Sequence, residues 1–214
     1  MDPSIMNRFF KDLTIPKSIL MTFILYGILL FLIFINVKLL NFDFNTTSFI
    51  SQLLILVIII ILFNNYFFQL KDLECSFLKI IQFTMLGVTI GTIYYIYQFI
   101  LSNKISQQYE ITISLLIESI FLGVIYEELF FRGIILKGLL KKHRPYVAII
   151  TSSLLFSLIH INQILYPLKF LSLLILGITC SIFYVKNKKV IIPIIIHASY
   201  NIGIIFFPKI LNLI

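Results

Sequence analysis

The sequence has few charged residues and only two cysteines, and each of these shortages excludes some classes of protein. Of the 214 residues, 12% are charged and 60% are hydrophobic, and the mean hydropathy is +1.05. Soluble domains carry about 25% charged residues, so this composition excludes a disordered tail, a collagen-like fibre and a disulfide scaffold and disfavours a soluble globule. Cys75 and Cys180 are far apart and fit no metal or redox spacing. The remaining class is an integral membrane protein.

Apolar runs long enough to cross a bilayer recur along the whole chain. A hydrocarbon core about 30 Å thick requires about 20 apolar residues in a helix. The connections between these runs are short and polar, with no interdomain linker, so residues 1–214 are expected to form a single domain. The predicted fold class is an all-α bundle of about seven transmembrane helices: Ile19–Val37, Phe49–Phe68, Ile80–Phe99, Ile111–Ile135, Tyr146–Ile164, Tyr166–Val185 and Val190–Phe207.

The basic residues predict how the bundle is oriented. With the N-terminus in the cytoplasm, twelve lysines and arginines of the loops fall inside and four fall outside. This bias follows the positive-inside rule and predicts a cytoplasmic N-terminus. The net charge of +8 is then explained by basic loops facing anionic lipid. The expected partner is the lipid bilayer, and no nucleic acid is expected.

The fourth run differs from the others because it contains ionisable residues. A charged side chain in hydrocarbon costs several kcal/mol unless it is paired or hydrated, which makes it a functional candidate. Glu128 and Arg132 are four residues apart on one helix face and are predicted to pair. Glu127 lies about 100° round the helix from Glu128, so it is left without this partner and is the candidate for chemistry. Glu118 lies near the outer boundary and is predicted to be interfacial.

Two histidines lie in apolar segments that follow the charged run. His160 ends the sequence Phe156–His160, and His197 lies on the last predicted helix. A single buried histidine is usually a structural residue, but two of them on separate helices, together with an unpaired glutamate, favour a functional site. Asn201 follows His197 by four residues, so both project from the same helix face.

Glutamate and histidine in the interior of a membrane bundle can activate water for attack on a carbonyl group. A second histidine and an asparagine amide can stabilise the resulting oxyanion. Glu127, His160 and His197 could instead bind zinc, which would then activate the water itself. Because Asn201 is a poor zinc ligand, a direct mechanism without a required cofactor is favoured, and zinc is left as the alternative.

Three motifs resemble those of the CPBP intramembrane proteases, a family of CAAX prenyl endopeptidases and of bacteriocin-processing and self-immunity proteins. The segment Glu127–Gly133 resembles the E-E-x-x-x-R motif, Phe156–His160 the F-x-x-x-H motif, and His197–Asn201 the H-x-x-x-N motif. The resemblance divides the domain into accessory spans over residues 1–110 and a CPBP-like catalytic core over residues 111–207.

The resemblance also implies a role for each motif residue. Glu127 corresponds to the catalytic glutamate, and His160 to its partner in activating water. His197 and Asn201 correspond to the pair that stabilises the oxyanion. The accompanying structural charges correspond to Glu128 and Arg132.

The leading functional hypothesis is therefore an intramembrane endopeptidase that cleaves a membrane-associated peptide or protein, which can be lipidated. Alternatives are a bacteriocin self-immunity or regulatory protein that does not require proteolysis, a proton-coupled transporter, and a scaffold whose charges only hold helices together. The oligomeric state is left open. Rich Ile, Asn and Lys usage is typical of AT-rich genomes and favours a bacterial plasma membrane.

Overall fold

The computed structural model describes residues 13–39, 44–67, 74–102, 111–160 and 167–211. Within these ranges all regular secondary structure is helical, which confirms the predicted all-α fold class. In the described residues, three helices precede the charged run and three follow it, in the predicted order. The first three are α2 (Ile15–Leu39), α3 (Phe44–Phe67) and α4 (Phe77–Ser102), and the last three are α8 (Pro145–Leu158), α9 (Pro167–Asn187) and α10 (Ile191–Leu211).

The charged run forms one composite helix that alternates between α-helical and π-helical turns. A π-helix has one more residue per hydrogen-bonded turn, and such turns often accompany functional sites. The adjacent glutamates, Glu127 and Glu128, lie at the end of the central α-helical stretch. The five segments are α5 (Ile113–Leu116), η2 (Ile117–Leu122), α6 (Gly123–Glu128), η3 (Leu129–Leu136) and α7 (Lys137–Leu139).

Two predicted boundaries in this part of the chain were wrong. The composite helix continues past Ile135 to Leu139, because the aliphatic stem of Lys137 can lie along apolar surface while its ammonium reaches outward. Helix α8 ends at Leu158 rather than at Ile164, and the residues 161–166 lie outside the described ranges. At 1.5 Å per residue its 14 residues span about 21 Å, less than the thickness of the hydrocarbon core.

Four of the described helices are long and apolar enough to cross a membrane: α2, α4, α9 and α10. Helices α3 and α8 contain shorter apolar stretches. Together with the composite helix these elements make an integral membrane bundle. The predicted cytoplasmic location of the N-terminus stays a prediction.

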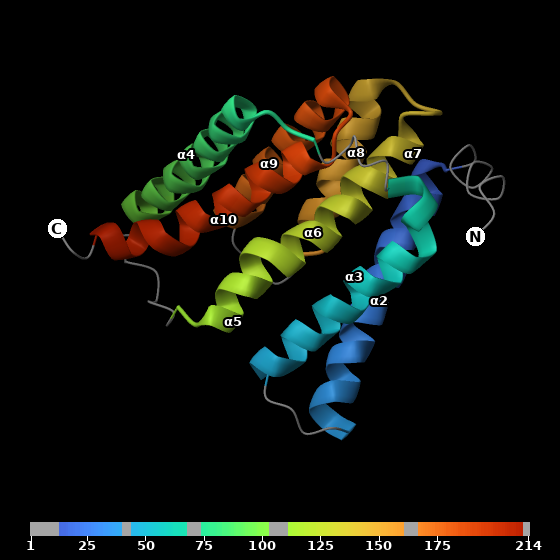
Figure 1. Cartoon of the computed structure of the whole chain (residues 1–214), viewed down its shortest axis with the longest axis horizontal. Coiled ribbons are helices and arrows are strands. Elements are labelled where there is room, and N and C mark those ends of the chain that lie inside the picture. Colours follow the sequence, from blue (N-terminus) through green and yellow to red (C-terminus); the bar gives the residue numbers. More distant parts are fainter. Residues whose placement is uncertain (1–12, 40–43, 68–73, 103–110, 161–166, 212–214) are drawn as a thin grey trace.

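The composite helix lies between two groups of helices. Helices α2 and α3 form a hairpin on one side of it, and α4 lies along α10 on the other (Figure 1). The Lys189 ammonium donates to the Glu74 backbone carbonyl at 2.7 Å, so α4 and α10 begin at the same end of the bundle and run parallel. This arrangement places α10, which carries His197 and Asn201, in contact with both α4 and α6.

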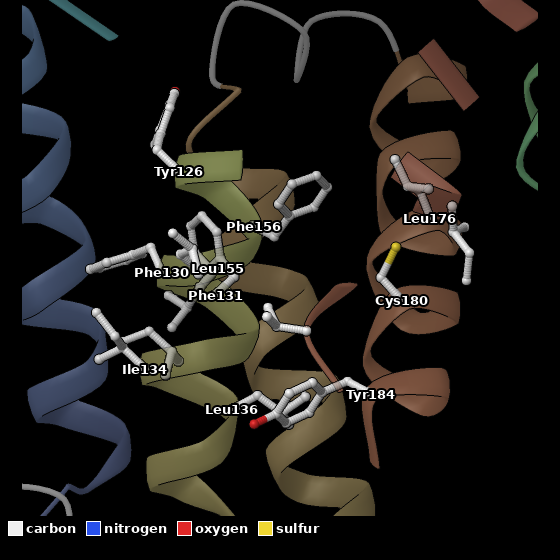
Figure 2. Close-up of a cluster of buried hydrophobic side chains, with 14 of the residues drawn as sticks. Tyr126, Phe130, Phe131, Ile134, Leu136, Leu155, Phe156, Leu176, Cys180 and Tyr184 are labelled. Atoms are coloured by element: carbon white, nitrogen blue, oxygen red, sulfur yellow. The ribbon is translucent and has the colours of Figure 1, made fainter. Parts of the chain in front are cut away.

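A cluster of aromatic and aliphatic side chains fills the space between the composite helix, α8 and α9. Phe131 packs edge-on against Phe156 at a centroid distance of 5.5 Å, and both side chains are fully buried. Leu176 and Cys180 extend this cluster along α9, while Phe130 points from η3 toward α2 (Figure 2). Close packing on this side fixes the helices that carry the polar residues described below.

Candidate active site

Three separated segments of the chain bring ionisable side chains together around Glu127. The carboxylate belongs to α6, His160 follows the end of α8, and His197 lies near the start of α10. One Glu127 oxygen, Oε1, lies 3.9 Å from His160 Nε2. The other oxygen, Oε2, lies 4.0 Å from His197 Nε2. Each imidazole thus faces a different oxygen of the same carboxylate.

These two separations are too long for direct hydrogen bonds but suit a water molecule that contacts both groups. The site is also not sealed, because the side chains of Glu127 and His160 keep exposed fractions of 11% and 22%. The Tyr126 hydroxyl donates to Glu127 Oε1 at 3.2 Å. The carboxylate is therefore held by one direct donor and has room for water beside it.

The end of α8 determines how the His160 ring is oriented. In a continuous helix the His160 backbone N–H would bond to the Phe156 carbonyl, but it bonds to the Ser157 carbonyl at 3.3 Å instead. The ring nitrogen Nδ1 takes its place and lies 3.0 Å from the Phe156 carbonyl oxygen. A carbonyl has no hydrogen to donate, so Nδ1 must carry the ring proton. In the neutral ring, Nε2 is then a hydrogen-bond acceptor that faces Glu127.

Glu128 contacts both Arg132 of its own composite helix and His197 of α10. Its Oε1 accepts a hydrogen bond from Arg132 Nη1 at 2.8 Å, which is the pair predicted from their spacing. The same oxygen accepts from His197 Nδ1, also at 2.8 Å. A carboxylate on one ring nitrogen fixes the tautomer and the direction of the other. Glu128 therefore aims His197 Nε2 at Glu127. The contact between Glu128 and His197 was not predicted from the helix-face argument.

Arg132 is fully buried, with an exposed fraction of 0%, and its guanidinium group contacts several partners besides Glu128. Its Nη2 donates to the Gly177 carbonyl on α9 at 3.0 Å. The guanidinium carbon lies 4.6 Å from the centroid of the Phe156 ring, in cation–π geometry. Within the described part of the chain, Glu128 Oε2 and Arg132 Nε have no hydrogen-bond partner.

Asn201 lies one helical turn beyond His197 on α10, as predicted. Its amide nitrogen donates to the Ser119 carbonyl on η2 at 2.6 Å. An amide nitrogen has two hydrogens, so one remains for another acceptor. Glu118, also on η2, is half-buried and accepts from Ser114 Oγ at 2.9 Å. The structure thus groups Glu127, His160 and His197 and places Asn201 at the neighbouring turn.

The zinc alternative can be compared with this geometry. Tetrahedral zinc holds nitrogen and oxygen ligands at about 2.0–2.1 Å, which places neighbouring ligand atoms about 3.4 Å apart. The observed separations of 3.9 and 4.0 Å are wider and involve different oxygens of Glu127. Among the described residues, no three His, Cys, Asp or Glu side chains form a group that could hold a metal. As placed, these residues do not fit zinc.

The sequence analysis missed three contributors to the site. Tyr126 contacts the Glu127 carboxylate, and its position beside a glutamate was the only sequence signal. Gly177 and Ser119 contribute backbone carbonyls, which accept from Arg132 and from Asn201. A carbonyl is present at every residue, so no sequence pattern could have identified these two.

A comparison with protein families adds an independent result. The family model described as type II CAAX prenyl endopeptidase Rce1-like matches residues 109–203. This region is similar to the Rce1-like endopeptidases. The match confirms the resemblance inferred from the motifs, contains all three of them, and indicates a protease at the level of the family. Helices α2, α3 and α4 precede the Rce1-like region. No curated protein and no solved structure matches the chain significantly.

Proposed function

We propose that this protein is an intramembrane endopeptidase that hydrolyses a peptide bond in a membrane-associated peptide or protein. The observation that carries the proposal is the Glu127 carboxylate, whose two oxygens face His160 Nε2 at 3.9 Å and His197 Nε2 at 4.0 Å. Similarity to the Rce1-like endopeptidases supports the reaction class. The substrate is membrane-associated because the site lies within a bundle of membrane-spanning helices, and it can carry a lipid.

In the first step, a water molecule lies between Glu127 and His160. It donates one hydrogen bond to Glu127 Oε1 and one to His160 Nε2, both of which are acceptors. A lone pair of its oxygen is then directed away from both groups, toward the substrate carbonyl carbon. Glu127 takes the proton as the carbon–oxygen bond forms, which is general base catalysis.

The tetrahedral intermediate carries its negative charge on the former carbonyl oxygen. His197 Nε2 and the remaining amide hydrogen of Asn201 are the donors we assign to this oxyanion. His197 donates from Nε2 when both ring nitrogens are protonated; Nδ1 then donates to Glu128, and the positive charge of the ring faces the oxyanion. The proton held by Glu127 passes to the leaving amine as the carbon–nitrogen bond breaks.

Glu128 and Arg132 act through other residues in this proposal. Glu128 orients His197, and Arg132 neutralises Glu128 while it ties η3 to the Gly177 carbonyl of α9. For localisation we propose a bacterial plasma membrane, on the basis of the Ile-, Asn- and Lys-rich composition. Expression in a bacterial host and membrane fractionation test this part.

The test of the activity compares Glu127→Gln with the wild type in the host membrane by quantitative terminomics. The amide is nearly isosteric but cannot act as a base, so cleavage should fall by about 10²–10⁴-fold. The matched control is Glu118→Gln, which changes a half-buried glutamate of the same composite helix. This control should keep the wild-type set of peptide termini.

Two results would contradict the proposal. If the termini in Glu127→Gln membranes equal those of the wild type, Glu127 is not the base. If both glutamine variants lose the same termini, the effect belongs to the helix rather than to the carboxylate. Purified protein treated with a chelator tests the mechanism separately, because a direct glutamate mechanism predicts unchanged turnover.

A further inference from the structure

Helix α4 lies outside the Rce1-like region, yet it packs directly on the helix that carries two site residues. Its contact face contains Gly87 and Gly91, which are four residues apart. The facing side of α10 contains Ser199 and Gly203, which have the same spacing. Small residues at this spacing let helix backbones approach closely in membranes. Since α4 and α10 run parallel, the two small-residue faces can align over their length.

Each glycine of α4 lies against the backbone of α10. A Cβ atom on Gly87 would collide with the Ile196 carbonyl oxygen and with Ser199 Oγ. A Cβ atom on Gly91 would collide with the Tyr200 carbonyl oxygen. Backbone atoms cannot rotate away as a flexible side chain can. A methyl group at either glycine therefore requires the backbones of α4 and α10 to move apart at that point.

The positions of these contacts on α10 match the positions of the site residues. Ile196 directly precedes His197, and Tyr200 directly precedes Asn201. The two glycines of α4 are therefore spaced four residues apart, as are the histidine and the asparagine of α10. We propose that Gly87 and Gly91 are positioning residues: Gly87 sets the place of His197, and Gly91 sets the place of Asn201. The catalytic consequence rests on the proposed function, whereas the structural one does not.

Any displacement of α10 caused by a larger residue on α4 acts on the contacts that hold α10 to the rest of the bundle. Tyr200 is hydrogen-bonded through its hydroxyl to Ser172 of α9. Asn201 is hydrogen-bonded to the Ser119 carbonyl. His197 is held to Glu128 at 2.8 Å through Nδ1. A displacement of α10 opposite Gly87 therefore changes the hydrogen bond between His197 and Glu128, whereas a displacement of α4 alone leaves it unchanged.

The first measurement needs no substrate. The chain has three histidines, so ¹⁵N-histidine NMR in detergent micelles, assigned with single His→Ala variants, resolves the Nδ1 proton of His197. Gly87→Ala should shift or broaden this resonance. Gly27→Ala is the matched control, since a Cβ atom at Gly27 of α2 meets no atom within 4 Å. The control should leave the resonance at its wild-type position.

The second measurement is turnover of a peptide that the wild type cleaves. Gly87→Ala and Gly91→Ala should each lower kcat by about 10–100-fold, the size of effect expected when reacting groups shift by up to about 1 Å. KM should change much less, because neither glycine touches the substrate. Gly27→Ala should retain wild-type kcat.

Additional variants keep the test decisive if Gly87→Ala does not fold. Gly87→Ala combined with Ser199→Gly removes the collision with the serine hydroxyl and should restore folding in part. Gly203→Ala makes a milder contact, with its Cβ 2.9 Å from the Val88 carbonyl oxygen, and should move the resonance less. An unchanged His197 resonance in every folded α4 or α10 variant would overturn the proposal. A shifted resonance in a protein without protease activity would support positioning and contradict only the proposed function.

Discussion

Helix α2 and the composite helix are both apolar runs of membrane-spanning length, but they satisfy their polar groups in different ways. In α2, the hydroxyls of Ser18 and Thr22 donate to the carbonyls four residues earlier in the chain, at 3.0 and 2.9 Å. A third polar side chain of α2, Asn36, donates to Ser51 Oγ of the neighbouring α3 at 3.3 Å. In the composite helix, Glu128 and Arg132 reach residues of α9 and α10. The two hydroxyl bonds are local, whereas the contacts of the charged pair require a specific tertiary structure.

This difference separates adaptation to the membrane from function. A hydroxyl that bonds within its own helix can lie at any depth and imposes nothing on its neighbours. A buried charge is tolerated only where other helices supply partners, so it determines where those helices lie. The charges of the composite helix thus specify the arrangement of α8, α9 and α10, whereas the hydroxyls of Ser18 and Thr22 are satisfied without a partner from another helix.

Among changes to polar side chains, the largest effect on stability is expected from Arg132→Ala. It leaves Glu128 buried without its cation, and breaking such a pair costs about 3–5 kcal/mol of unfolding free energy. SDS titration in mixed micelles measures this change. Lys17→Ala is the control, because Lys17 is an exposed cation in α2. Equal unfolding free energies for the two variants would contradict the contrast between the two helices.

The sequence predicted those parts of the site that depend only on helix geometry. The four-residue spacing of Glu128 and Arg132 is enough to pair them, and the pair is present at 2.8 Å. The position of Glu127 off that face follows from the same rule. Helix number and order also follow from hydropathy, since each run must be long enough to cross a bilayer.

The remaining features depend on a local side-chain contact at the end of α8 and on a contact between distant segments. The end of α8 at Leu158 was missed because Ile159 and Ile161 continue the apolar pattern. There the His160 ring replaces its own backbone as the partner of the Phe156 carbonyl. The contact between His197 and Glu128 joins residues 69 positions apart, and no local pattern encodes it.

A smaller effect is expected from Ser152→Ala. The Ser152 hydroxyl donates from α8 to the Phe131 carbonyl of η3 at 2.9 Å, which makes it an interhelical bond. Such bonds in membrane proteins contribute about 0.6 kcal/mol on average and up to about 1.7 kcal/mol. Thr22→Ala is the matched control, since it removes a bond within α2. SDS titration should give a larger loss for Ser152→Ala than for Thr22→Ala, and the reverse order would contradict the distinction between local and tertiary polar contacts.

The smallest effect is expected from Phe23→Ala in α2. The Phe23 side chain keeps an exposed fraction of 69%, so it faces lipid in both the folded bundle and the separated helices. Its removal should change the unfolding free energy by less than about 0.5 kcal/mol. Phe131→Ala, at a fully buried position, should cost about 3–5 kcal/mol because it leaves a cavity. If SDS titration gives similar losses for the two variants, the exposed face of α2 is covered by protein rather than by lipid, and α2 is then fixed by tertiary contacts as the composite helix is.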